Sequence, residues 1–444
     1  MAKIIISFLG TGGYTDKYNE ARGEYHKTNY TIEEKEFHEE FVASALLKHY
    51  KADKIIFIGT LKAMWDVVYD HFCKNTITDI YEKLFEFKNN ATHQTEITEG
   101  AFIEDAFSKS KISPILIKYG LNNEEHEFNI RQLFNIQDHI NSGDKLYLDI
   151  THGFRSLPLV LSGVLNFLID NIKKDVTIED ITYGMREVSH EMNGKSPIVS
   201  LNILQELNQT IKASHEFTQY GNAYLFSQIL KQNPKTKSEG TLLNDFSDSI
   251  TLNHIDNMVK SIPKLKGIKP DNFNAIQSLI IPKTIETYIN QFKGPKTDSN
   301  YQYEIANWHL KNKSYGYAAI GFAEAIITKI CECLFLEPSD EVCRKLAKDV
   351  FYDKAKDALK KDLYRRDRKD LLPKIKTIIN TRKQFKGYKK MYSDINDIRI
   401  AIAHAKKTEN SPENMIRTLK SEADNIKKFI YSDKHSYQLN ARNK

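Results

Sequence analysis

The chain has 444 residues, which is too many for one ordinary hydrophobic core, so two or three domains are expected. Its 41% hydrophobic and 27% charged residues are typical of a soluble globular protein, and no apolar run reaches the roughly 20 residues of a membrane-spanning helix. The four cysteines exclude a disulfide-rich secreted scaffold and favour a reducing, cytoplasmic location. The apolar start leads into glycines without a cleavage site, which predicts a first strand and no signal peptide.

Positive charge is concentrated in one C-terminal stretch. Residues 344–390 contain 18 Lys or Arg and 6 Asp or Glu, whereas the rest of the chain contains 46 basic and 52 acidic residues. Because Tyr364, Phe385 and Tyr388 are interleaved with these cations, the stretch suits a polyanion such as nucleic acid. The alternative is the solvated face of lysine-rich helices, and composition alone leaves both open.

Three of the cysteines invite comparison with a zinc site. Cys331 and Cys333 have an unusual Cys-x-Cys spacing in an apolar helical run, and with Cys343 they still lack a fourth ligand. We therefore expect buried thiols and no bound metal.

Strands and helices alternate over the first 200 residues. Near-continuous apolar strands separated by helical segments predict an α/β, Rossmann-like domain with a parallel-rich sheet covered on both faces. The predicted strands are Lys3–Leu9, Lys54–Ile58, Pro114–Tyr119, Lys145–Ile150, Val176–Tyr183 and Ile198–Leu201, and the predicted helices are Ile32–Tyr50, a segment through Trp65 and Tyr69, Glu124–Asn141 and Phe154–Asn171.

The strand pattern ends near residue 201, and helices with polar breaks follow to the end of the chain. We found no internal repeat and no long low-complexity tract. The sequence therefore predicts three parts: a sensing domain over 1–205, a helical connector over 206–295 and an all-α domain over 296–444.

Three predicted strands end in turns that suit a phosphate-bearing ligand. Glycines let backbone N–H groups approach an anion, threonines add hydroxyl donors, and a helix N-terminus attracts negative charge. Because the carboxyl ends of parallel strands share one edge, the turns should meet there. They contribute Gly10, Thr11, Gly12 and Gly13, then Gly59 and Thr60, then Asp149, Thr151, His152, Gly153 and Arg155.

A nicotinamide dinucleotide site is the main competitor at this edge. The third glycine of that fingerprint is missing after Gly13, and a long polar loop stands where the fingerprint requires a helix. We therefore disfavour a dinucleotide cofactor.

The stretch Asp149–Gly153 resembles the DxTHG signature of CRISPR-associated proteins, and the opening Phe8–Gly12 with its Tyr-containing loop is similar to the start of that family. The resemblance implies a CARF domain, a Rossmann-like sensor of cyclic oligoadenylate made by type III CRISPR complexes. It also implies a homodimer with the ring-shaped activator across the two-fold axis. Tetra-adenylate is the first expectation, with ring size and higher assembly left open, and no further cofactor is implied.

The second motif lies in the predicted helical domain. Arg399 and His404 stand five positions apart, about 140° around a helix, so a compact site needs two helices meeting at a two-fold axis. Arg-x4-His resembles the signature of HEPN ribonucleases. This implies metal-independent cleavage of RNA to a 2′,3′-cyclic phosphate and a 5′-hydroxyl, with His404 moving a proton and Arg399 holding the phosphate. Asn396 lies one turn before Arg399 and is a third candidate, while Ile400 departs from the polar residue common in the family.

Together these motifs predict an antiviral, cyclic-oligoadenylate-activated endoribonuclease. One alternative is a non-catalytic, CARF-regulated nucleic-acid-binding protein, although no convincing DNA-reading helix was found. Another is a HEPN toxin ribonuclease that cyclic oligoadenylate does not control.

Overall fold

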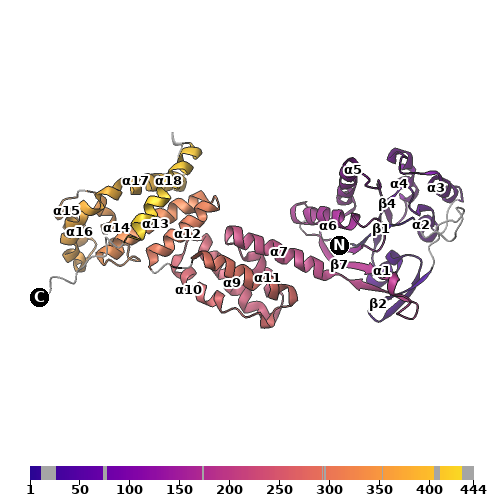
Figure 1. Ribbon diagram of the computed structural model, residues 1–444, viewed down its shortest axis with the longest axis horizontal. Coiled ribbons are helices and arrows are strands. Elements are labelled where there is room, and N and C mark those ends of the chain that lie inside the picture. The colour runs from indigo at the N-terminus through magenta and orange to yellow at the C-terminus, as the bar shows by residue number, and fades with distance from the viewer. Residues whose placement is uncertain are drawn as a thin grey trace. The chain divides into compact units, whose positions relative to one another are not determined.

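The computed structural model describes residues 1–11, 27–73, 78–172, 175–292, 294, 297–352, 354–404 and 411–432. They divide into two compact units, an N-terminal unit of Met1–Glu206 and a C-terminal unit of Leu207–Lys444. In the N-terminal unit strands and helices alternate, whereas the described part of the C-terminal unit is helical (Figure 1). The predicted fold class is confirmed.

One eight-stranded sheet, in the order β3-β2-β8-β7-β6-β1-β4-β5, forms the N-terminal unit. The five strands from β7 to β5 run parallel, while β8 is antiparallel to β7 and β3 is antiparallel to β2. The carboxyl ends of β1, β4, β6 and β7 therefore lie at one edge. The strands are β1 (Lys3–Leu9), β2 (Thr28–Ile32), β3 (Lys35–Glu39), β4 (Lys54–Thr60), β5 (Ile112–Ile117), β6 (Lys145–Asp149), β7 (Thr177–Gly184) and β8 (Lys195–Ser200).

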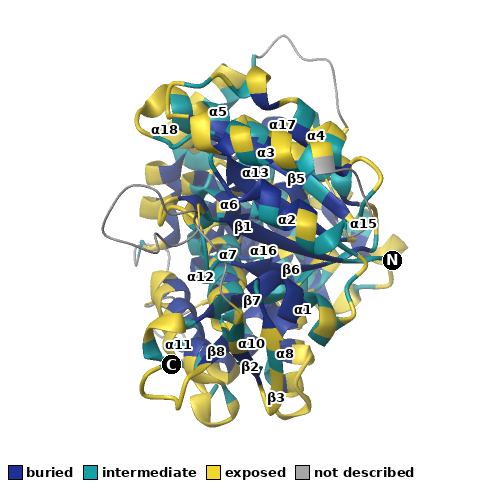
Figure 2. Cartoon of the chain, turned by 90° about the vertical axis from the view of Figure 1, so that its right-hand side faces the viewer, coloured by how far each residue is buried: buried dark blue, intermediate teal, exposed yellow. Residues whose placement is uncertain are grey.

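Helices cover both faces of this sheet, as the apolar strands predict. Alternate residues of β1 point to opposite sides, so Ile5 joins one buried cluster and Ile4 and Ile6 join the other. The central strands are deeply buried (Figure 2). On the Ile5 side pack α1 (Val42–Tyr50), α2 (Trp65–Phe72), α3 (Thr78–Asn90) and α4 (Phe102–Phe107), and on the other side pack α5 (Asn123–Phe134) and α6 (Leu157–Phe167).

The predicted helix Ile32–Tyr50 is wrong in its first half, where β2 and β3 form a hairpin. Tyr30 and Ile32 are buried while Thr31 between them is not, which is the period of a strand. Glu33 takes a φ of 55° in the turn. The hydrophobic spacing of the following residues is compatible with both a helix and a strand. The pairing of β2 with β8 favours the strand.

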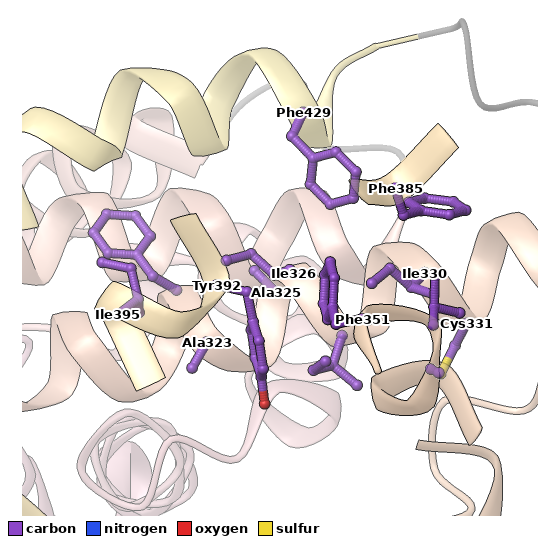
Figure 3. Packing of buried hydrophobic residues seen from close by; sticks show 14 of the residues in the cluster. Ala323, Ala325, Ile326, Ile330, Cys331, Phe351, Phe385, Tyr392, Ile395 and Phe429 are labelled. Atoms are coloured by element: carbon purple, nitrogen blue, oxygen red, sulfur yellow. The ribbon is translucent and has the colours of Figure 1, made fainter. Parts of the chain in front are cut away.

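The C-terminal unit contains two buried clusters, one around Phe217 and Tyr288 and one around Phe322 and Phe385. Figure 3 shows part of the second. The division between connector and C-terminal domain near residue 295 stays a prediction. The helices are α7 (Asn202–Tyr220), which starts in the N-terminal unit, α8 (Tyr224–Lys231), α9 (Lys237–Thr251), α10 (Ile255–Lys266), α11 (Ala275–Ile289), α12 (Asp298–Lys311), α13 (Tyr315–Leu334), α14 (Glu341–Lys348), α15 (Lys356–Arg365), α16 (Leu372–Phe385), α17 (Lys389–Ala403) and α18 (Pro412–Ile430).

The three cysteines of this unit are buried in the second cluster. Burial raises the pKa of the Cys331 thiol to about 12 and that of Cys333 to about 11, so both stay protonated near neutral pH. Among the described residues, no helix combines the length and apolar character needed to cross a bilayer.

Candidate functional site

The glycine and threonine turns meet at the carboxyl edge of the sheet. They enclose a pocket of about 160 Å³ lined by Gly10 and Thr11 after β1, Gly59 and Thr60 at the end of β4, and Gly153 after β6. Gly12 and Gly13 lie outside the described residues. Five apolar residues complete the wall: Leu9, Ile58, Ile117, Phe154 and Leu157.

Asp149 and Thr151 shape the third turn through bonds within the protein. The fully buried Asp149 carboxylate accepts hydrogen bonds from Ser7 Oγ at 2.6 Å, from Thr151 N at 3.0 Å and from Thr151 Oγ1 at 2.5 Å. Thr151 Oγ1 in turn accepts from Gly184 N at 2.7 Å. These bonds join the ends of β1, β6 and β7. The side chains of Asp149 and Thr151 therefore stabilise the turn next to the pocket.

Two of the glycines are required by local geometry. Gly153 has a φ of +92°, and a Cβ there would lie 3.0 Å from Phe8 Cβ. A Cβ on Gly59 would lie 2.9 Å from both Ala63 Cβ and the Trp65 ring. Gly59 therefore has a packing role, whereas Gly153 gives the turn the backbone conformation that precedes α6.

His152 and Arg155 lie on the turn that leads into α6. Burial lowers the pKa of His152, with opposing influences from Asp149, which raises it, and Arg186, which lowers it. The imidazole is therefore neutral at pH 7. Arg155 is exposed and precedes the first residue of α6, because the helix begins three residues later than the predicted Phe154.

The end of β7 is a fourth contributor to this edge that was not predicted from the sequence. Arg186 follows β7 at the same edge, is exposed, and acts electrostatically on His152 and on the buried Tyr30. The strand itself was predicted, so its carboxyl end, Gly184-Met185-Arg186, was the available signal.

In the C-terminal unit, α17 carries Asn396 and Arg399 and ends at His404. Arg399 Nη1 donates to Asn396 Oδ1 at 3.3 Å, so Asn396 orients the guanidinium. His404 follows the last helical residue, its backbone N–H bonds Ile400 O at 3.0 Å, and its side chain is exposed. Within the described part of this unit, no hydrogen bond or ion pair joins Arg399 to His404.

A carboxylate on α13, Glu324, was not foreseen at this site. Arg399 Nη2 lies 3.7 Å from Glu324 Oε1, and Arg344 binds the other oxygen, Oε2. Glu324 is the one charged residue between Lys313 and Lys329, in a run of small and apolar residues. An isolated charge on an otherwise buried helix was the signal for it.

The basic stretch 344–390 is partly neutralised. Cations such as Lys345, Arg366 and Arg368 form ion pairs with carboxylates. Phe385 is fully buried and is unavailable to a ligand, whereas Tyr364 is more than half exposed. Exposed cations for which no ion pair is found within the described residues include Lys356, Lys361, Arg365, Lys376 and Lys383. The described residues also contain no group of three or more His, Cys, Asp or Glu able to hold a metal.

Comparisons with known proteins agree with the two-part fold. Residues 4–187 match the family model for the CARF domain of the CRISPR system endoribonuclease Csx1, and residues 206–298 match that for the second domain of CRISPR-associated protein MJ1674. CRISPR-associated protein MJ1674 of Methanocaldococcus jannaschii is 30% identical over 374 residues. The match covers 80% of this chain and 57% of that relative, which is longer.

Proposed function

This chain is a CRISPR-associated protein with an N-terminal CARF domain, and from that premise we propose that it is an endoribonuclease activated by cyclic oligoadenylate. The observation that carries the proposal is the pocket of Gly10, Thr11, Gly59, Thr60 and Gly153, which lies inside the segment matched to the CARF domain. Its target in this proposal is single-stranded RNA during type III CRISPR antiviral defence, which places the protein in the cytoplasm.

The ligand is bound mainly by backbone groups. Thr11 and Gly153 offer N–H groups, while the side chains of Asp149 and Thr151 are occupied in shaping the turn. Phosphates of the ring lie near the N-terminus of α6, where the helix dipole favours negative charge. The exposed guanidiniums of Arg155 and Arg186 add positive charge at the same edge. The nonpolar wall of the pocket accommodates part of an adenine.

A homodimer is part of the proposal because one pocket holds only a portion of a ring. The α6 helix, which starts at the pocket, exposes apolar side chains: Leu159 is 78% exposed and Phe167 is 47% exposed. Such a face favours contact with a second apolar surface. Two copies joined there by a two-fold axis would present both pockets to one ring.

In the proposed reaction His404 accepts the proton of an RNA 2′-hydroxyl, whose oxygen attacks the adjacent phosphorus. The 5′-oxygen leaves with a proton from the partner's histidine or water, which yields a 2′,3′-cyclic phosphate and a 5′-hydroxyl. Arg399, oriented by Asn396, holds the phosphate and offsets the charge that develops on its oxygens. No metal is required, and the exposed cations of 344–390 hold the RNA backbone.

Substitution of the two proposed catalytic residues tests this function. Arg399→Ala and His404→Ala should each lower the rate of RNA cleavage by at least about a hundredfold, the scale expected for a phosphate-binding or proton-transferring group. Arg417→Ala, which removes an exposed arginine from α18, is the matched control and should cleave at the parent rate. Product ends should be 2′,3′-cyclic phosphate and 5′-hydroxyl. Full activity in either catalytic variant would refute the site, and a protein that binds RNA without any cleavage would be a regulator.

A further inference from the structure

Glu324 contacts two arginines, Arg344 and Arg399, which differ in how firmly their guanidiniums are held. Arg344 donates to Glu324 Oε2, to Thr328 Oγ1 at 3.1 Å and to Pro338 O at 3.1 Å, so its guanidinium is held by three acceptors. Its side chain is 19% exposed. Arg344 therefore belongs to the scaffold that fixes the Glu324 carboxylate in place.

Arg399 is held less tightly. Its Nη2 lies 3.7 Å from Glu324 Oε1, which is an ion contact beyond hydrogen-bond distance, and its side chain is 35% exposed. Asn396 supplies one hydrogen bond at 3.3 Å. Of the two guanidiniums on this carboxylate, that of Arg399 is the one that can leave Glu324 for another anion.

The surroundings keep Glu324 where it is. Ala323 and Ala325 on either side of it are buried in the cluster around Phe322 and Phe385, part of which Figure 3 shows with Tyr392. The Tyr392 phenol lies within electrostatic range of Glu324 and Arg399, and burial raises its pKa to about 12, so it adds no charge near neutral pH. The carboxylate is thus the anionic counterpart of Arg399 among the described contacts.

We propose that Glu324 is a positioning residue that holds Arg399 at rest and competes with the RNA phosphate for its guanidinium. The inference rests on the proposed function, because it assigns the phosphate of the RNA to Arg399. A carboxylate and a phosphate cannot both receive the full charge of one guanidinium. Glu324 therefore sets how readily Arg399 binds RNA. Arg344 holds the Glu324 carboxylate in place, so the carboxylate does not move with Arg399 when Arg399 binds the RNA phosphate.

A double-mutant cycle measured by RNA binding tests this assignment. The parent is the full-length His404→Ala protein, which should bind without cutting, and the probe is an unstructured single-stranded RNA. Adding Glu324→Gln should tighten binding about threefold to tenfold, because the amide keeps the shape but not the charge. The plot of log affinity against log salt should steepen by up to about 0.7, the value of one additional phosphate contact on a single strand. Adding Glu324→Gln to an Arg399→Ala, His404→Ala protein should change neither quantity.

Glu413→Gln is the matched control, since it removes one exposed carboxylate from α18 in the same unit, for which no ion pair is found among the described residues, and it should leave both quantities near the parent values. If Glu324→Gln does not fold, as thermal unfolding will show, Glu324→Asp withdraws the carboxylate by one methylene and should tighten binding to a smaller extent. Unchanged binding, or tightening that persists without Arg399, overturns this inference alone. A parent protein that fails to bind RNA overturns the proposed function together with it.

Discussion

His309 on α12 is a buried histidine close to the region that carries α17. Only 4% of it is exposed, and among the described residues neither ring nitrogen has a hydrogen-bond partner. The ring stacks on Tyr317 at 5.1 Å, and the neighbouring Gly316 lies against Ile402 of α17. Burial lowers the pKa of His309 to about 4, so the folded protein holds a neutral imidazole there.

This depressed pKa predicts a pH-dependent stability. As the pH falls, His309 takes up a proton near pH 6.5 in the unfolded chain but only near pH 4 in the folded chain. The contribution of His309 to the free energy of unfolding is therefore complete above pH 6.5 and is lost as the pH falls toward 4. Between pH 7 and pH 5 the loss should be about 2 kcal/mol of unfolding free energy. His309→Phe should remove that part of the pH dependence. Urea unfolding at both pH values measures it, and an unchanged dependence in the variant would refute the assignment.

For single residues, the sequence predicts which side chains can bind a ligand or act on it better than it predicts which other side chains they contact. Strand-end glycines and threonines were identified because a parallel sheet gathers them at one edge, and the structure places Gly10, Gly59 and Gly153 around one pocket. Glu324 and Arg186 were missed because their role depends on contacts with distant segments. Spacing along one helix also left open how Arg399 is held, which is decided by α13.

Among the elements, α6 is the one that would join the proposed ligand binding to the proposed association of two copies. It begins beside the pocket at Leu157, follows the Gly153 turn, and presents Leu159 to solvent on another side. A ligand at the N-terminus of α6 and a second copy on its apolar face would therefore act on the same rigid helix.

Leu159→Glu should disrupt the proposed dimer. A carboxylate on the apolar face of α6 is costly to bury, so the dissociation constant should rise at least about tenfold. Sedimentation velocity over a range of protein concentrations measures this. Leu252→Glu, at an equally exposed leucine after α9, is the control and should sediment as the parent does. A dimer that survives Leu159→Glu would show that the copies associate through another surface.

The secondary structure of a segment could be predicted where its residues fitted the pattern of a helix or of a strand alone. The prediction failed where the residues fitted both patterns. The apolar runs of β1, β4 and β6 fit only the pattern of buried strands. The segment from Ile32 to Tyr50 carries spacing compatible with a helix, yet its first part pairs with β8 through β2, and only the complete sheet makes that pairing favourable. Local periodicity does not contain that information.

For the whole molecule, the proposed function requires the N-terminal unit to control the C-terminal unit. The α7 helix carries the chain from one to the other: Asn202 at its start bonds the backbone of Ile181 and Glu179 on β7, and Phe217 near its end is buried in the cluster around Tyr288. A ligand can shift activity only by the difference in its affinity for the active and resting arrangements.

The most direct test is the rate of single-stranded RNA cleavage by the full-length protein with and without saturating cyclic tetra-adenylate or hexa-adenylate. We expect one ring to raise the rate at least about tenfold, which corresponds to ~1.4 kcal/mol of differential binding. The increase should vanish in Arg399→Ala while that variant still binds the ring. Cleavage at the same rate with and without both rings would contradict control by the N-terminal pocket.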